Sequence, residues 1–311
     1  MPWREVLDLY DLLDDASASG EAVAAWLRKS GVEDVNATRV QGDKGSTDFV
    51  RAVIPGSRGR SAGGDAPTLG VIGRLGGLGA RPERIGFVSD GDGALVALAV
   101  AGKLGSMAQR GDQLPGDVIV ATHVCPDAPT RPHDPVPFMD SPVDVTAMNE
   151  HEVEDAMDAV LSVDTTKGNR VVNHLGFAIS PTVKEGWILR VSEDLLDLAS
   201  QVTGRLPVVL PLTMQDITPY GNDVYHINSI LQPCTATSAP VVGVAVTTET
   251  AVPGCGTGAT DLVSVESAAR FCLEAAKSYG AGACSFFDPA DFDRLTTLYG
   301  SMHHLQTMGT A

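Results

Sequence analysis

The chain has 311 residues, of which 43% are hydrophobic and 20% charged, as in ordinary globular proteins. Its formal net charge of −17 repels phosphate backbones and anionic lipid, so nucleic acid and membranes are excluded as expected partners. No apolar run approaches the roughly 20 residues that cross a bilayer, and the N-terminus lacks the pattern of a signal peptide. Five scattered cysteines without a Cys-x-x-Cys pair indicate free thiols, and we expect a cytoplasmic protein.

Helical and β-type patterns alternate along the chain. We expect helices at residues 6–13, 22–28, 94–104, 151–161, 193–202, 262–276 and 292–305, and a mostly helical segment ending at residue 230. We expect strands at residues 36–40, 47–54, 68–72, 117–121, 160–164, 187–189, 206–212 and 240–246. This order predicts one α/β domain over residues 1–311, with a mixed, largely parallel sheet between two helical layers.

An acidic turn at residues 84–94 separates a strand end from a buried helix. Asp90 and Asp92 lie there between glycines, which allow a ligand to approach the backbone closely. In open α/β sheets, ligands bind at the carboxyl ends of the strands. Asp90 is therefore a candidate metal ligand, whereas Asp92 fits a helix cap better. Asp164, at the end of another strand, is a similar candidate.

His123 and Cys125 alternate on an extended segment, so we expect their side chains to share one face. Either could bind a divalent metal, and a nearby His could activate the thiol as a nucleophile. The alternative is a buried structural cysteine and a structural histidine. The proline-rich residues 126–142 that follow predict an extended loop without helix or sheet, which forms a wall of the site.

Three further places carry candidate residues. Cys255 lies in the glycine-rich run 254–258, which forms either an anion-binding turn or an ordinary one. Arg74, in a glycine-rich loop after a strand, could pair with a substrate carboxylate or lie on the surface. One segment carries four candidate substrate-binding residues, of which Asp223 could recognise an amine or cap a helix: Asp216, Tyr220, Asp223 and His226.

Several motifs, taken together, resemble those of the co-catalytic zinc exopeptidase and amidohydrolase superfamily. They are Ser19-Gly20-Glu21 before a helix, Asp90-Gly91-Asp92-Gly93-Ala94, Val163-Asp164-Thr165-Thr166 and Gly221-Asn222-Asp223. The chain also resembles a bacterial family of unknown function within that superfamily. The resemblance implies an aminopeptidase-like fold, with Asp90 and Asp164 in the positions of metal-binding carboxylates.

The chain also departs from the superfamily pattern. Where a His-x-Asp motif should follow a strand, the sequence reads Gly73-Arg74-Leu75-Gly76. The place of the Glu-Glu pair, which supplies the general base, reads Thr122-His123-Val124-Cys125-Pro126, and residues 254–257 contain no final His. Only Asp90 and Asp164 match, and the chain has no insert of the size of a lid or dimerisation domain.

These observations predict a divergent hydrolase of an amide or peptide-like small molecule. Asp90, Asp164 and His123 would hold one divalent metal, zinc or manganese, and His123 or a second Asp would act as the base. One alternative is metal-free thiol catalysis by Cys125 or Cys255 in a hydrolase or isomerase. Another is a non-catalytic protein that binds a small molecule. The expected partners are a small-molecule or short-peptide substrate and further copies of the chain in a homo-oligomer.

Overall fold

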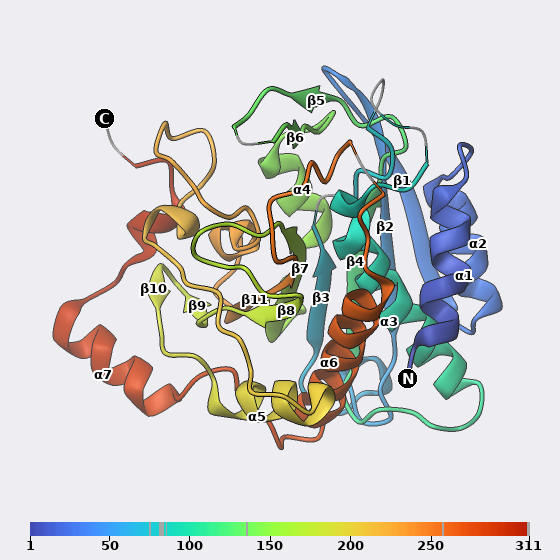
Figure 1. Ribbon diagram of the computed structural model, residues 1–311. Helices are drawn as coiled ribbons and strands as arrows, with labels where there is room; N and C mark the ends of the chain where they lie inside the picture. The colour runs from blue at the N-terminus through green and yellow to red at the C-terminus, as the bar shows by residue number, and fades with distance from the viewer. Residues whose placement is uncertain (75, 81–83, 85, 135, 257, 310–311) are drawn as a thin grey trace.

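The computed structural model describes residues 1–74, 76–80, 84, 86–134, 136–256 and 258–309 (Figure 1). The centre of this part of the chain is a nine-stranded mixed sheet in the order β1-β2-β4-β3-β7-β11-β9-β10, with β8 paired to β11. Its strands are β1 (Asp34–Gly42), β2 (Gly45–Ile54), β3 (Leu69–Gly73), β4 (Val118–Val124), β7 (Ala159–Thr166), β8 (Gly176–Ile179), β9 (Val183–Lys184), β10 (Trp187–Ile188) and β11 (Val241–Thr247). A separate small sheet pairs β5 (Thr130–Arg131) with β6 (Phe138–Met139).

The middle of the large sheet is parallel. β3 pairs in parallel with β4 and with β7, and β7 pairs in parallel with β11. The β1–β2 hairpin adds two antiparallel strands beside β4, and β8 and β9 pair antiparallel with β11. Because the four parallel strands run in the same direction, their carboxyl ends form one edge, where we expect ligands to bind.

The helices differ in length and in how they pack. They are α1 (Trp3–Asp14), α2 (Gly20–Lys29), α3 (Asp92–Ala108), α4 (Val145–Glu152), α5 (Glu193–Thr203), α6 (Leu262–Gly280) and α7 (Pro289–Tyr299). Short 3-10 helices are η1 (Arg60–Ala62), η2 (Ser89–Gly91), η3 (Gln215–Ile217), η4 (Gln232–Thr235) and η5 (His303–Gln306). Helix α3 joins β3 to β4 and packs against β3, β4, β7, α1 and α6, which makes it the centre of the helical layer (Figure 1).

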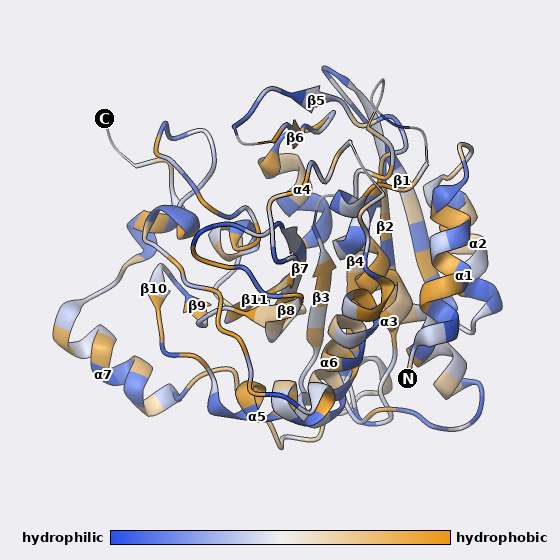
Figure 2. Ribbon diagram, in the orientation of Figure 1, coloured by the Kyte–Doolittle hydropathy of each residue, from blue (hydrophilic) through white to orange (hydrophobic). Residues whose placement is uncertain are grey.

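The composition of α3 explains this central position. Apart from three polar residues it consists of Ala, Val, Leu, Gly and one Met, and residues from Asp92 to Gly102 are buried all round the helix. A helix that is apolar on every side has to be surrounded by protein. By contrast, α1 and α2 each bury one side against the sheet or α3, and they carry both hydrophilic and hydrophobic colours in Figure 2.

Alternate residues of the parallel strands enter two different cores. Val71 of β3 and Leu161 of β7 point to the layer formed by α1, α2, α3, α5 and α6, whereas their neighbours Ile72 and Val160 point to the opposite face. This is the alternation expected of a strand buried on both sides. The second core receives Leu210, Ile217, Ile230 and Leu231 from the chain between β10 and β11.

The second face of the sheet is covered differently from the first. Helix α4 packs on β2 and β4, and much of the remaining cover consists of η3, η4 and irregular chain from about residue 206 to residue 240. The predicted α/β class and mixed sheet are therefore confirmed, while the two faces are covered unequally. Prolines at positions 207, 211, 219 and 233 explain the irregular cover, because each removes a backbone donor and restricts the chain.

Several predicted elements are wrong. Residues 206–212 form only an isolated bridge between Val209 and Ile179, because two prolines interrupt the segment. Residues 151–161 are the end of α4, a loop and the start of β7, because Asp144 caps α4 earlier than expected. The segment ending at residue 230 forms turns, and the last predicted helix ends at Tyr299 before Gly300. The proline-rich loop contains the β5–β6 hairpin.

No helix within these described ranges has both the length and the apolar composition that crossing a bilayer requires.

The position of α3 generates a stability prediction. Leu98 is completely buried in the helical core, whereas Leu7 on α1 is 48% exposed. We expect Leu98→Ala to lower the free energy of unfolding by about 2–5 kcal/mol, because the truncation removes buried methyl groups and leaves a cavity. Leu7→Ala, the matched control, should change it by less than about 0.5 kcal/mol. Urea denaturation measures both values, and equal effects of the two substitutions would contradict the central role of α3.

Candidate functional site

Polar side chains gather where the parallel strands end. Arg74 follows β3, His123 is near the end of β4, and Asp164 is near the end of β7. On each of these strands an apolar residue points to the second core: Ile72, Ile119 and Val160. The polar residue comes two or four positions later in the chain. Strand alternation therefore directs the three polar side chains to the same face of the sheet. All three are buried, with exposed fractions of 1–2%.

A buried ion-pair network joins two of these strand ends to α4. Arg74 Nη1 lies 2.5 Å from Glu152 Oε2, and the other oxygen, Oε1, lies 2.7 Å from His123 Nδ1. Asn149 of α4 also accepts a hydrogen bond from Arg74, at 3.3 Å. Burial disfavours the charge of Glu152, but Arg74 and His123 together hold the pKa of this carboxyl below its usual value.

Both ring nitrogens of His123 have partners in this network. The backbone N–H of Gly76 donates to Nε2 at 3.1 Å, so the proton is on Nδ1, which donates to Glu152. His123 thus has no ring nitrogen left for a metal ion or for taking a proton from water. Arg74 is likewise directed to Glu152. The sequence had suggested that Arg74 could pair with a substrate carboxylate, but the guanidinium is already paired inside the protein.

Three carboxyl groups lie beyond this network, at the same edge of the sheet. Burial raises the pKa of Asp90 to about 6, although the nearby Lys167 ammonium opposes the shift. Burial also raises the pKa of Asp164 to about 7 and that of Asp92 to about 7. The charge of Asp90 adds to the rise at both other groups. These three carboxyl groups, Asp90, Asp92 and Asp164, are called the carboxyl cluster below.

The members of the carboxyl cluster differ in their access to solvent and in their partners. Asp92 is buried at the start of α3 and accepts a hydrogen bond from Thr260 at 2.9 Å. Asp164 is buried and accepts hydrogen bonds from the Ser229 hydroxyl at 2.9 Å and from the Thr165 amide at 2.7 Å. Asp90 is only half-buried, so it is the member that solvent or a substrate can reach.

A row of polar side chains leads from Asp164 towards the surface. Ser229 donates to Asp164, and Tyr220 is close enough to both residues for them to affect its pKa. Burial, and then the charge of Asp164, raise the pKa of Tyr220, which keeps its hydroxyl protonated. Ser229 and Tyr220 are both half-buried. The row therefore leads from a buried carboxyl to two more accessible hydroxyl groups.

Backbone contacts hold Asp90 against the loop that follows β11. The Asp90 N–H donates to the Gly254 carbonyl at 3.3 Å, and the Thr165 hydroxyl donates to the Ser89 carbonyl at 2.8 Å. A Cβ atom on Gly254 would lie 2.1 Å from Asp90 Oδ1 and 2.9 Å from Lys167 Cε. A larger residue at position 254 would therefore displace the side chains of Asp90 and Lys167, which both lie against the glycine backbone.

The expected metal site from Asp90, His123 and Asp164 is not formed. In the part of the chain that the structure describes, no group of three or more His, Cys, Asp or Glu side chains is placed to hold a metal ion. The reason lies in His123, whose two nitrogens are bonded to Gly76 and Glu152. The donor set implied by the zinc-enzyme resemblance therefore does not fit this site.

The two candidate nucleophilic thiols are buried. Cys125 and Cys255 lie in one apolar cluster with Ala80, Val88, Ala128 and Met139. Burial raises the pKa of the Cys125 thiol to about 11, contrary to the expectation that a neighbouring histidine would lower it. The Cys255 thiol contacts the carbonyl of Pro137 at 3.3 Å. The glycine-rich run around Cys255 also includes residue 257, which lies outside the described residues.

The segment expected to recognise a substrate has mixed roles. Asp216 is buried and orders its own loop, because its oxygens accept hydrogen bonds from Thr213, Ile227 and Asn228. Asp223 is exposed, with a left-handed φ of 61°.

Two members of this segment lie together. The His226 ring packs edge-on against Tyr220, with 4.5 Å between the ring centroids. Of the four predicted residues, Tyr220 is the one whose pKa is affected by Asp164 of the carboxyl cluster and by Ser229, which donates to Asp164.

Sequence reasoning missed Glu152, Ser229 and Lys167. Glu152 ends a helix whose position was misjudged, so its approach to Arg74 could not be foreseen. Ser229 lies in an irregular segment with no motif. Lys167 follows Asp164 by three residues, and its proximity to a candidate carboxyl was the one available signal.

The buried network generates a second prediction. Glu152→Gln should lower the free energy of unfolding by about 3–5 kcal/mol near neutral pH, because Arg74 would keep its charge without an anionic partner. The pKa of Glu152 is depressed in the folded protein, so its contribution is present above the ordinary value of 4.5 and disappears as the pH falls through the folded-state value. Wild type and variant should therefore converge in acid.

Denaturant titrations between neutral and acidic pH measure this difference. Glu150→Gln, at an exposed position of the same helix, is the control and should have little effect. A Glu152→Gln protein as stable as wild type at pH 7 would show that the ion pair contributes nothing.

Comparison with known proteins places the chain in one family. A family model described as "Protein of unknown function (DUF1177)" matches residues 38–309, which include every residue of the site described above. No curated protein matches the chain. From the extent of the match, the chain belongs to the DUF1177 family.

Proposed function

We propose that the protein is a hydrolase of an amide or peptide-like small molecule, with the carboxyl cluster as its active site. The observation that carries this proposal is the raised pKa of both Asp90, about 6, and Asp164, about 7. Near neutral pH such a pair contains one group that accepts a proton readily and one that still carries a proton. Acid–base catalysts need pKa values close to the working pH.

In the proposed reaction, Asp90 accepts a proton from a water molecule as that water attacks the carbonyl carbon. The carbon–nitrogen bond then breaks, and the departing nitrogen receives a proton from the hydroxyl of Ser229. In its protonated form, Asp164 donates across the same 2.9 Å contact and replaces the proton that Ser229 has lost. Lys167, beside Asp90, is placed to stabilise the negative charge that develops on the carbonyl oxygen.

No step of this mechanism uses a metal ion, because both ring nitrogens of His123 are already hydrogen-bonded and the expected set of metal ligands is incomplete. A distant relation to the co-catalytic zinc aminopeptidases, with their three-layer fold, remains part of the proposal. The order of the elements and the positions of Asp90 and Asp164 at the carboxyl edge of the sheet support it. We also propose that the protein is a cytoplasmic homo-oligomer and that its substrate is a small molecule or a short peptide.

The test begins with a search for substrate. Dipeptides, N-acyl amino acids and simple amides are incubated with the protein near pH 6.5, and the products are identified by mass spectrometry. Parallel incubations contain a chelator, or added zinc or manganese. The proposal expects turnover that the chelator does not abolish. A compound that binds but is recovered intact in all incubations would instead indicate a binding protein.

The third prediction concerns the carboxyl pair. With a substrate in hand, Asp90→Asn and Asp164→Asn should each lower kcat by about 10²–10⁴-fold, the usual range for loss of an acid or base. Asp65→Asn, at an exposed position away from the site, should retain wild-type activity. Activity equal to wild type in both site variants would contradict the assignment.

The fourth prediction is the pH dependence of kcat/KM. The rate should rise as Asp90 loses its proton near pH 6 and fall as Asp164 loses its proton near pH 7. Because the two groups interact, the two limbs belong to the pair and not to single residues. A profile with no fall above pH 7 would argue against Asp164 as the acid.

A further inference from the structure

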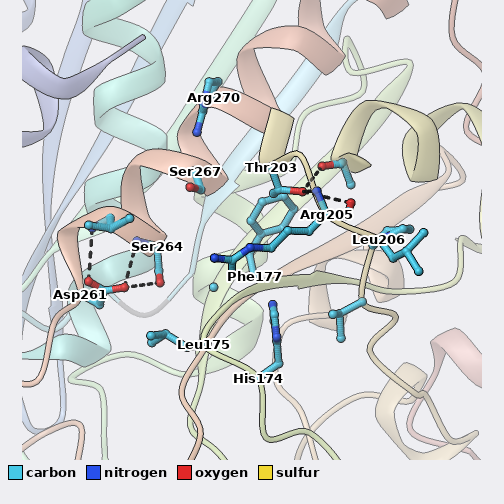
Figure 3. A pocket seen from close by; sticks show the side chains of 15 residues that line it. His174, Leu175, Phe177, Thr203, Arg205, Leu206, Asp261, Ser264, Ser267 and Arg270 are labelled. Carbon is cyan, nitrogen blue, oxygen red and sulfur yellow. Dashed lines mark hydrogen bonds between the residues drawn. The ribbon is translucent and has the colours of Figure 1, made fainter. Parts of the chain in front are cut away.

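A hollow lies away from the carboxyl cluster, between α5, α6 and β8. Its cavity volume is about 330 Å³, at the small end of the range for ligand pockets. Figure 3 shows Arg205 and His174 reaching towards its interior, with Ser264, Ser267 and Arg270 of α6 along one side. We call this hollow the α5–α6 pocket.

One part of the α5–α6 pocket is apolar. Phe177 of β8, Ala199 of α5 and Val208 line it. At its rim, Leu206 is 88% exposed and Leu175 is 46% exposed. Large aliphatic side chains around a concave site favour a ligand with an apolar body, which would cover them.

The principal cation of the pocket is Arg205. Gly204 ends α5 in a left-handed conformation, with a φ of 67°, and the Arg205 amide donates to the Thr203 hydroxyl at 3.2 Å. These contacts fix the backbone from which the guanidinium extends. Across the described residues, the Arg205 side chain has neither an ion pair nor a hydrogen bond, although the chain has 39 acidic residues against 22 Lys and Arg.

The other charged groups of the pocket already have partners. Arg270 pairs with the buried Glu266 at 3.2 Å, while its Nε lacks a hydrogen-bond partner. Asp261 caps α6 by accepting hydrogen bonds from the amides of Val263 and Ser264. Its charge is therefore directed to the helix amides. Arg205 is left as the cation available to a ligand.

We propose that the α5–α6 pocket binds a small organic anion, a carboxylate or phosphate monoester on a compact apolar body. The anionic group pairs with the Arg205 guanidinium, whose planar donors match carboxylate and phosphate oxygens. The apolar body lies against Phe177, Leu206 and Val208. The hydroxyl of Ser267 provides a further donor beside the pocket, whereas the Ser264 hydroxyl donates to Asp261.

Two neighbouring residues connect this pocket to the carboxyl cluster. Asp261 lines the pocket, and the adjacent Thr260 donates the 2.9 Å hydrogen bond to Asp92. The inference is nevertheless independent of the proposed hydrolase, because it rests on Arg205 and the apolar walls. Binding can therefore be tested without any known activity.

The probes are benzoate and phenyl phosphate, with benzyl alcohol and inorganic phosphate as controls at the same ionic strength. Benzyl alcohol has the ring without the charge, and inorganic phosphate has the charge without the ring. We expect at least one organic anion to bind saturably, with a Kd of about 1 mM or tighter, by calorimetry. It should also raise the Tm, because a ligand of the folded state stabilises it. Neither control should match this effect.

The deciding variant is Arg205→Gln, which keeps a polar side chain at an exposed position. It should weaken binding of the organic anion about tenfold or more, a loss of about 1.4 kcal/mol. Arg110→Gln is the matched control, because Arg110 is also exposed just beyond the end of a helix. No binding of either anion, equal binding of benzyl alcohol, or unchanged affinity in Arg205→Gln would each overturn the proposal.

Discussion

The burial of one guanidinium constrains the centre of this fold. Arg74 follows the central strand β3 and is 1% exposed, so its charge requires an anion inside the protein. Glu152 provides that anion from the end of α4, and the same carboxylate orients His123 at the end of β4. One carboxyl group thus fixes the position of α4 and the tautomer of a histidine. The Glu152 carboxylate also keeps the side chains of Arg74 and His123 away from the accessible part of the site.

The elements that sequence predicted well are those whose own residues decide their structure. The apolar run of α3 is a local signal, and so are the residues of α2, which Ser19 caps; both helices lie close to where they were expected. Strands β3, β4, β7 and β11 are apolar enough to be recognised as buried. The longest run of failed predictions lies between residues 206 and 230, where the chain takes its conformation from contacts with the second core. Asp216 organises that segment through hydrogen bonds to residues up to 12 positions away, a pairing that no periodicity reveals.

The candidate site was predictable in place but not in chemistry. Asp164 lies near the end of β7, and Asp90 lies in η2, directly before α3, so both are found at the carboxyl edge of the sheet. The role of His123 depended on Glu152, 29 residues later, and on the amide of Gly76. Sequence contains no signal for either contact. Likewise, Cys125 and Cys255 suggested reactivity by their neighbours in sequence, whereas packing against Val88 and Met139 makes them parts of an apolar cluster. Electrostatic environment is a property of the assembled fold.

The burial of the thiols has a consequence for how this protein can be studied. All five cysteines are buried thiols, at positions 125, 234, 255, 272 and 284. A thiol reagent can therefore react only when the structure around a given cysteine opens. Cys272 reports on α6, and Cys255 reports on the loop beside Asp90, so their labelling rates compare the local opening of these two regions. The native cysteines therefore serve as probes of local opening in different parts of the fold, and no label has to be introduced.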